Sequence, residues 1–251
     1  MSPEQSSTAT GVLTCPQPSH LWLDSLDESD RARVVSTGMA QRSGFTRNAA
    51  ILVIDVQNYM IGSPDGRGSA DDWPSVCPGG VQAVERSASL LDTARAAGMP
   101  VFYTVMVLRR DGRDAGGYLR KRKLIDTDGW MIEGTTGAEI VAGLAPHDRD
   151  LVLRKNKPSA FFGTPLTGYL QESGVDTVVV IGGSTSNCVR ATVIDAASLN
   201  YRVVVPADCV IDRFETSHRT TLFDLDRQYA DVVQSRDLID AWSTPSTAVR
   251  P

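Results

Sequence analysis

Short apolar runs alternate with helix-like segments along most of this sequence, and this alternation limits the possible folds. Residues 50–54 contain no polar position, which is typical of a strand buried on both faces of a parallel sheet. Residues 81–97 instead place apolar side chains at helical spacing, and Gly98 supplies a C-terminal stop. Further strands are expected at 101–107, 151–153, 177–181, 202–205 and 231–233, and further helices at 166–172, 188–199, 222–229 and near Leu238.

This alternation predicts an α/β fold: a doubly wound, Rossmann-like parallel sheet of six strands with helices on both faces. In such sheets, ligands bind at the carboxyl ends of the strands, near the point where the strand order reverses. The candidate reactive residues are therefore those that follow Ile54, Leu153 and Ile181.

The first part of the chain differs from the rest. Ser, Thr and Pro are frequent up to His20 without a hydrophobic period, which predicts a mobile tail, and residues 21–35 form a short amphipathic piece that could dock on a neighbour. The folded core is expected to begin sharply at Ala49. We therefore expect an N-terminal tail and oligomer-contact extension at 1–45 and one hydrolase domain at 46–251, a length that suits a single large α/β domain.

Composition excludes several classes of protein. A formal net charge of −5 provides no basic footprint for nucleic acid or for an anionic membrane surface. No segment approaches the ~18 uninterrupted apolar residues of a membrane helix, and the N-terminus lacks the pattern of a secretion signal. No CxxC pair or disulfide framework is formed by the four cysteines, Cys15, Cys77, Cys188 and Cys209. We expect a cytoplasmic protein without nucleic-acid or membrane partners.

The strand ends carry an acid, an amine and a thiol: Asp55, Lys155 and, just beyond the third strand, Cys188. Covalent catalysis needs such a set, with a nucleophile, a proton acceptor and a group that tunes both. Taken singly, each has a plainer interpretation as a turn former, a solvent-facing lysine or a packed cysteine. The Gly- and Ser-rich turn before Cys188 favours function, because a thiol in the first turn of a helix has a lowered pKa and free N–H groups there can hold an oxyanion.

Three motifs resemble those of the isochorismatase-like cysteine hydrolases. Residues 51–57 (ILVIDVQ) look like the family's opening strand and catalytic Asp, residues 155–164 (KNKPSAFFGT) resemble its K-x-x-x-S-A-F-x-x-T segment, and residues 184–192 resemble its nucleophile turn. The resemblance covers about residues 42–240. It implies that Cys188 is the nucleophile, that Asp55 is the proton shuttle, and that Lys155 rather than Lys157 supports the ionised thiol.

The same resemblance implies finer features of the site. It places a non-proline cis peptide between Gly183 and Ser184, with the backbone N–H groups of Ser184 and Cys188 as the oxyanion hole. Phe161 and Thr185, which lie in the second and third motifs, are expected beside the substrate. The implied reaction cleaves the C–N bond of a small amide or ureido compound through a thioester and releases ammonia, with neither a metal nor an organic cofactor.

Nicotinamidases of this superfamily carry a metal site built from an Asp and several histidines shortly after the catalytic Asp. This chain has only three histidines, and none lies between Asp55 and Cys77, which argues against a metal. The cysteine itself favours amide chemistry over vinyl-ether cleavage. Residues 42–45 (RSGF), 208–213 (DCVIDR) and 222–226 (LFDLD) resemble the N-carbamoylsarcosine and maleamate amidases. Those relatives act on small linear amides or ureido compounds and form tetramers, so a homotetramer is expected.

Several alternatives stay open. Arg213 is the candidate substrate anchor, because a guanidinium binds a carboxylate through two parallel hydrogen bonds, but a structural salt bridge with Asp212 or Asp208 is equally compatible with the sequence. Within the amidohydrolases, maleamate and biuret- or triuret-type ureides are both candidate substrates. A dinucleotide-binding dehydrogenase would share the sheet but needs a GxGxxG fingerprint that the turn at 182–184 lacks. A non-catalytic module that binds ligands through its thiol is the remaining class.

Overall fold

The computed structural model describes residues 11–16, 22, 26–62, 73, 75–122 and 129–243. One parallel sheet forms the centre of the molecule, and six of its strands follow the order β3-β2-β1-β4-β5-β7, with a short seventh strand, β6, beside the end of β4. The strands are β1 (Ala49–Ile54), β2 (Val101–Met106), β3 (Leu151–Lys155), β4 (Thr177–Gly183), β5 (Arg202–Pro206), β6 (Val210–Ile211) and β7 (Asp231–Val233). The predicted doubly wound parallel sheet is confirmed.

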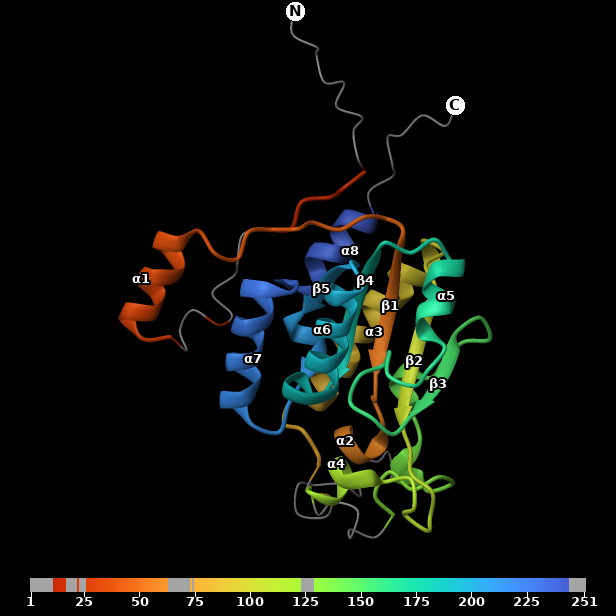
Figure 1. The fold of residues 1–251 in the computed structure, drawn as a ribbon. Coiled ribbons are helices and arrows are strands. Elements are labelled where there is room, and N and C mark those ends of the chain that lie inside the picture. Colours follow the sequence, from red (N-terminus) through yellow and green to blue (C-terminus); the bar gives the residue numbers. More distant parts are fainter. Residues whose placement is uncertain are drawn as a thin grey trace, which may run out of the picture.

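Helices cover both faces of the sheet (Figure 1). They are α1 (Glu28–Thr37), α2 (Asn58–Ile61), α3 (Gly80–Ala96), α4 (Gly116–Arg120), α5 (Leu166–Glu172), α6 (Arg190–Ser198), α7 (Glu215–Gln228) and α8 (Ser235–Ser243). Ile51 of β1 packs in the core beneath α3 and α8, whereas Leu52 packs in the core beneath α5, α6 and α7. Because successive strand residues face opposite sides, β1 must be apolar throughout. Within the described ranges, no helix is long and apolar enough to cross a membrane.

Several element boundaries differ from those that the sequence predicts, among them the boundaries of α7, β3 and α6. Helix α7 begins at Glu215 rather than at Leu222, because its first two turns are polar and show no hydrophobic period. Strand β3 extends to Lys155, so this lysine ends the strand instead of following it. A single π-helical turn, Thr185–Val189, precedes α6, so Cys188 does not lie in the first turn of an α-helix.

The N-terminal segment is more closely packed than a mobile tail would be, as far as the described residues go. Leu13 and Phe45 exchange backbone hydrogen bonds of 2.7 and 3.0 Å, and Cys15 is buried. Trp22 and Phe45 are each 1 % exposed, so the core includes residues before the predicted start at Ala49. Residues 1–10 and 17–20 lie outside the described residues. The domain division after residue 45 stays a prediction.

The strand order reverses between β1 and β4. The chain builds β1, β2 and β3 outward in one direction, and β4 then returns to the other side of β1. At Gly182, where φ is +103°, a Cβ would lie 2.2 Å from the Ile54 carbonyl oxygen, so only glycine lets β4 pass so close to β1. Helices α2 and α4 lie beyond the carboxyl ends of the strands (Figure 1). The expected ligand-binding position is therefore between these strand ends and α4.

Candidate active site

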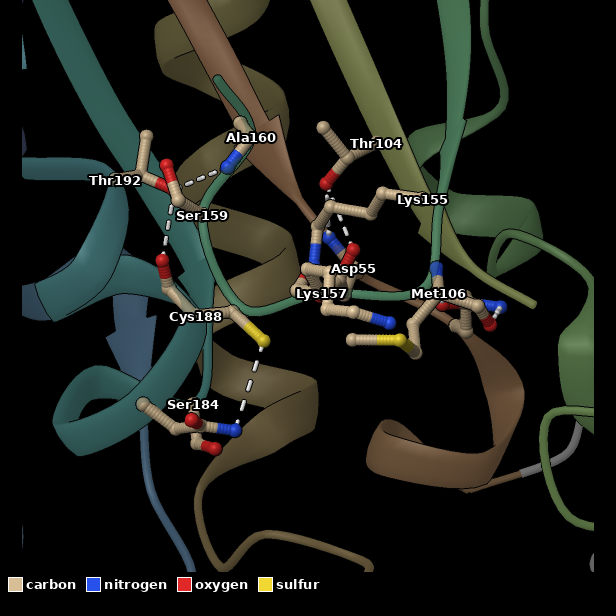
Figure 2. A network of polar contacts seen from close by, with 12 residues as sticks. Asp55, Thr104, Met106, Lys155, Lys157, Ser159, Ala160, Ser184, Cys188 and Thr192 are labelled. Carbon is tan, nitrogen blue, oxygen red and sulfur yellow. Dashed lines mark hydrogen bonds and ion pairs between the residues drawn. The ribbon is translucent and has the colours of Figure 1, made fainter. Parts of the chain in front are cut away.

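A buried ion pair joins two of the strand ends. Asp55 directly follows β1, and its φ of 50° turns the chain into the left-handed region that Asp tolerates. Lys155 Nζ donates to Asp55 Oδ2 at 2.6 Å, and the two side chains are 0 % and 1 % exposed. Thr104 Oγ1 donates to the other carboxylate oxygen at 2.7 Å (Figure 2). Both oxygens of Asp55 are therefore held in place.

Cys188 follows β4, whereas Asp55 and Lys155 come from the ends of β1 and β3. The sulfur of Cys188 points toward this ion pair (Figure 2). The residue is 3 % exposed, and Asn187 Nδ2 lies 3.6 Å from its Sγ. Thr192 Oγ1 donates to the Cys188 carbonyl at 2.7 Å and accepts from the Ala160 N–H at 3.0 Å. The Thr192 hydroxyl therefore connects the motif at residues 155–164 to the motif at residues 184–192, and the two form one structural unit.

The acidity of the thiol differs from the sequence-based prediction. Burial raises the pKa of the Cys188 thiol to about 12; the Lys155 ammonium acts to lower it, and the Asp55 carboxylate acts to raise it. Burial also opposes the charge of Lys155, but Asp55 and then Cys188 outweigh it and hold the pKa of this lysine above its ordinary value. The predicted lowering of the Cys188 pKa is wrong, because desolvation dominates and Asp55 already compensates the lysine charge. Burial therefore favours the protonated form of the resting thiol.

The turn before Cys188 is held by its own backbone and by one carboxylate. The Gly183–Ser184 peptide is cis, as predicted. The Asn187 and Val189 N–H groups donate to the Ser184 carbonyl at 3.0 and 3.3 Å. Asp212 Oδ2 accepts from the Ser186 N–H at 2.7 Å. The oxyanion role of the Ser184 and Cys188 N–H groups stays a prediction.

Arg213 lies against the nucleophile turn, where its Nη1 donates to Ser184 Oγ at 3.1 Å. The salt-bridge alternative is not realised among the described residues. Asp208 instead accepts from the backbone N–H and the hydroxyl of Ser235, and Asp212 Oδ1 accepts from the Arg213 backbone N–H at 2.7 Å. Arg213 also lines a cavity of about 580 Å³ together with His218. Its guanidinium is thus beside the site without a carboxylate partner in the described part of the chain.

The other two predicted substrate contacts are placed differently. Thr185 Oγ1 donates to the Ile211 carbonyl at 3.0 Å and lies 2.9 Å from His218 Nδ1, so its hydroxyl is engaged with β6 and α7. The ring of Phe161 is half-buried and stacks on Tyr201 with 6.3 Å between centroids. Contact of either residue with substrate stays a prediction.

The site also includes three residues that have no counterpart in the sequence-based set, namely Thr104, Tyr118 and Asn187. Thr104 was detectable, because it is the polar residue at the centre of an otherwise apolar strand and is in register with Ile54. Tyr118 lies on α4, within a stretch that shows no recognisable pattern, and reaches Asn187 through its hydroxyl group. Nothing in the sequence signals that contact. In the described residues, no cluster of His, Cys, Asp and Glu could hold a metal ion.

The doubly wound sheet brings an acid, a lysine and a thiol together where its strand order reverses. The model of the isochorismatase domain matches residues 49–237. The chain is 39 % identical to a maleamate amidohydrolase of Pseudomonas putida over 78 % of this chain and 88 % of that protein. It is 31 % identical to an N-carbamoylsarcosine amidase of Arthrobacter over 80 % of this chain and 74 % of that protein.

Solved structures agree with this assignment. An isochorismatase family protein from Desulfovibrio vulgaris has a TM-score of 0.69 and 35 % sequence identity, over 79 % of this chain and 100 % of that chain. The chain therefore belongs to the isochorismatase family of hydrolases, and the two relatives named above are an amidohydrolase and an amidase.

Proposed function

We propose that this hydrolase is an amidohydrolase that uses Cys188 as a nucleophile to cleave the C–N bond of a small linear amide or ureido compound, and that it releases ammonia through a thioester intermediate. The observation that carries the proposal is the buried Asp55–Lys155 pair beside a buried thiol. A burial of this kind is costly for all three groups, and perturbed pKa values such as those of Lys155 and Cys188 are concentrated at functional sites.

The first half of the reaction begins from a neutral thiol. Asp55 takes the proton from Cys188 as the sulfur attacks the substrate carbonyl carbon, and the carbonyl oxygen becomes an oxyanion that accepts from the Ser184 and Cys188 N–H groups. Asp55 then passes the proton to the nitrogen, the C–N bond breaks, and ammonia departs. Lys155 keeps its charge throughout, so it stabilises Asp55 before the transfer and the sulfur after it.

The second half regenerates the enzyme. Asp55 removes a proton from water, and the resulting hydroxide attacks the thioester carbon. Collapse of the tetrahedral intermediate breaks the C–S bond and leaves the acid product. The sulfur recovers its proton from Asp55, which restores the ion pair with Lys155. Asp55 carries the proton in every transfer of this cycle.

A carboxylated substrate is favoured within this class. The similarity to the maleamate amidohydrolase supports a short amide that bears a carboxylate. Arg213, which makes no carboxylate pair in the described structure, supplies the matching cation beside the nucleophile turn. The similarity to the N-carbamoylsarcosine amidase supports a ureido compound that also bears a carboxylate, such as an N-carbamoyl amino acid. Uncharged ureides such as biuret or triuret are the remaining candidates.

The test combines a substrate panel with detection of the intermediate. The purified protein should release ammonia from maleamate or from N-carbamoyl amino acids, and biuret and triuret serve as carboxylate-free comparisons. Mass spectrometry after a rapid acid quench should find the acyl group on the peptide that contains Cys188. Stoichiometric labelling of Cys188 by iodoacetamide, with no ammonia from any panel member, would instead favour the non-catalytic binding module.

We propose further that the protein is a cytoplasmic homotetramer whose active sites border subunit interfaces. Phe162 and Phe214, which follow site residues in the sequence, are 66 % and 68 % exposed, as expected of side chains that a second subunit covers. The four cysteines are all unpaired thiols, which suits a reducing compartment. Light scattering coupled to gel filtration tests the assembly, and a monomer at micromolar concentration contradicts it.

A further inference from the structure

A chain of hydrogen bonds runs from α4 to the sulfur of Cys188. The Tyr118 hydroxyl oxygen lies 2.9 Å from Asn187 Oδ1 and 2.6 Å from Asn187 Nδ2. Asn187 Nδ2 in turn lies 3.6 Å from Cys188 Sγ. At the outer end, Arg122 Nη1 donates to the Tyr118 hydroxyl at 3.2 Å, with its guanidinium 5.8 Å from the ring centroid.

We propose that the Asn187 side chain is a catalytic hydrogen-bond donor to the nucleophile sulfur, and that Tyr118 positions it. The inference rests on Cys188 being the nucleophile, as proposed above. It assigns a function to α4 and to the residue directly before the cysteine. Neither belongs to the acid–lysine–thiol set.

Arg122, Tyr118 and the Asn187 amide form one set of hydrogen bonds. A guanidinium can only donate, so one lone pair of the Tyr118 oxygen accepts from Arg122. The other lone pair accepts from Asn187 Nδ2 at 2.6 Å, and the phenol hydrogen is available for Asn187 Oδ1. The second hydrogen of Asn187 Nδ2 is then left for the sulfur. The reversed amide would present its oxygen to Cys188 and repel the charge that forms there.

Both ends of this hydrogen-bond chain are firmly placed. Ala115 and Leu119, on either side of Tyr118, are each 0 % exposed and pack in the core. Asn156 Nδ2 donates to the Asp114 carbonyl at 3.3 Å, which ties the start of α4 to the segment after β3. The backbone N–H of Asn187 donates to the Ser184 carbonyl at 3.0 Å. The donor is therefore pre-organised.

The donor contributes more to the transition state than to the resting enzyme. The charged groups that face the sulfur are Lys155 from β3 and Asp55 from β1, and Tyr118 faces it from α4. Burial and the neighbouring Cys188 raise the pKa of Tyr118, so the phenol keeps the proton that it must donate. Hydrogen bonds to charged acceptors are about twice as strong as those to neutral ones. Asn187 therefore gains strength as the thiol becomes a thiolate, which accelerates attack.

The test measures the thiol directly, without requiring turnover. The rate constant for alkylation of Cys188 by iodoacetamide is followed by peptide mass spectrometry across the neutral-to-alkaline range, alongside kcat/KM for the best amide of the panel. Asn187→Ala should lower both the alkylation rate constant at fixed pH and kcat/KM by on the order of ten- to a hundredfold. The alkylation profile should move to higher pH. Tyr118→Phe should cause a smaller loss in the same direction.

A double variant and a matched control separate positioning from packing. Asn187→Ala combined with Tyr118→Phe should be no worse than Asn187→Ala alone, because Tyr118 acts through Asn187. The control is Tyr169→Phe on α5, which removes the hydroxyl of a tyrosine that is 40 % exposed and stacks on Phe102. It should leave both rate constants unchanged. If Tyr118→Phe does not fold, Arg122→Gln removes only the outer donor and should slow alkylation.

Two outcomes overturn the proposal: a wild-type alkylation rate and pH profile in Asn187→Ala, or losses that simply add in the double variant. Failure of the proposed function looks different, because Cys188→Ala would then retain turnover. If Cys188→Ala is inactive while Asn187→Ala alkylates like the wild type, only the donor role is wrong.

Discussion

Two buried acids in this molecule each pair with a cation, and they differ in what lies beside them. Asp55 pairs with Lys155 at 2.6 Å and Asp226 pairs with Arg42 at 2.5 Å, and in both pairs the side chains are at most 7 % exposed. Asp226 is surrounded by scaffold donors, since its oxygens also accept from the Val232 N–H at 2.7 Å and from Trp22 Nε1 at 3.0 Å. Asp55 has the buried thiol of Cys188 as its neighbour.

The Asp226 pair connects distant parts of the chain. Arg42 belongs to the segment before β1, whereas Asp226 lies on α7. Asp231 continues the network by accepting from the Ser43 and Gly44 N–H groups at 3.0 and 2.8 Å. The R-S-G-F and L-F-D-L-D motifs therefore meet in one structural network. Burial of an ion pair alone does not identify a catalytic site, and the two pairs differ in the thiol that lies beside Asp55.

The largest effect on activity is expected from removal of the Cys188 thiol, which distinguishes the Asp55 pair from the Asp226 pair. Cys188→Ala should abolish turnover without changing the melting temperature, because it removes the nucleophile at little packing cost. Initial ammonia-release rates and thermal melts measure the two quantities. Cys209→Ser is the matched control, since Cys209 is buried near the end of β5, away from the proposed chemistry, and should retain most activity. More than a few per cent of the wild-type rate in Cys188→Ala contradicts the covalent mechanism.

The second effect separates the two ion pairs. Arg42→Met leaves Asp226 charged and buried without its partner, so the free energy of unfolding should fall by about 3–5 kcal/mol. The kcat of the folded fraction should stay unchanged. Urea denaturation and activity assays provide the measurements. Arg219→Met, which breaks an exposed pair with Glu215, should cost ~0–1 kcal/mol. A loss of kcat without a loss of stability in Arg42→Met would place this pair in the catalytic machinery.

A smaller effect is expected at the substrate anchor. Arg213→Lys keeps the charge but loses the planar fork, so kcat/KM should fall by on the order of 1–3 kcal/mol in transition-state terms. The melting temperature should barely move, because Arg213 makes no ion pair within the described residues. Steady-state kinetics on carboxylated and uncharged amides measure the effect. Wild-type kinetics, or a joint loss of stability and activity, would assign Arg213 to the scaffold.

His218 adds a modest pH dependence of stability next to the nucleophile turn. Burial lowers the pKa of His218 below its ordinary value of 6.5. The unfolded chain then binds this proton more readily than the folded one, so stability is full above pH 6.5 and is lost as the pH falls towards the folded-state pKa. His218→Gln should flatten this part of the curve of melting temperature against pH. A slope that is the same in wild type and variant contradicts the prediction.

The smallest expected effect is none at all. Dialysis against EDTA should leave the ammonia-release rate unchanged, because both carboxylate oxygens of Asp55 already accept hydrogen bonds, one from Lys155 and one from Thr104. The control is the same dialysis without chelator. A loss of ammonia release that zinc, manganese or iron restores would contradict this prediction and would make Asp55 part of a metal site.

The strands and the positions of the reactive residues were predictable from local information. β1 and residues 178–181 of β4 are unbroken apolar runs, and such runs can be recognised from consecutive residues alone. Asp55, Lys155 and Cys188 were located because parallel strands bring their carboxyl ends to one edge of the sheet. The start of α7 was missed because its first turns, from Glu215, are polar and carry no hydrophobic period.

The parallel sheet, the family motifs and the order of acid, lysine and thiol follow from the sequence alone. They depend on short-range residue patterns and on the way parallel strands are connected. The tertiary structure alone decided the raised pKa of Cys188, because desolvation is a property of everything packed around the sulfur. It also decided the pairing of Arg42 with Asp226 and the contact of Tyr118 with Asn187. Each of these contacts joins residues far apart in the chain, and only the packing of the folded protein brings them together.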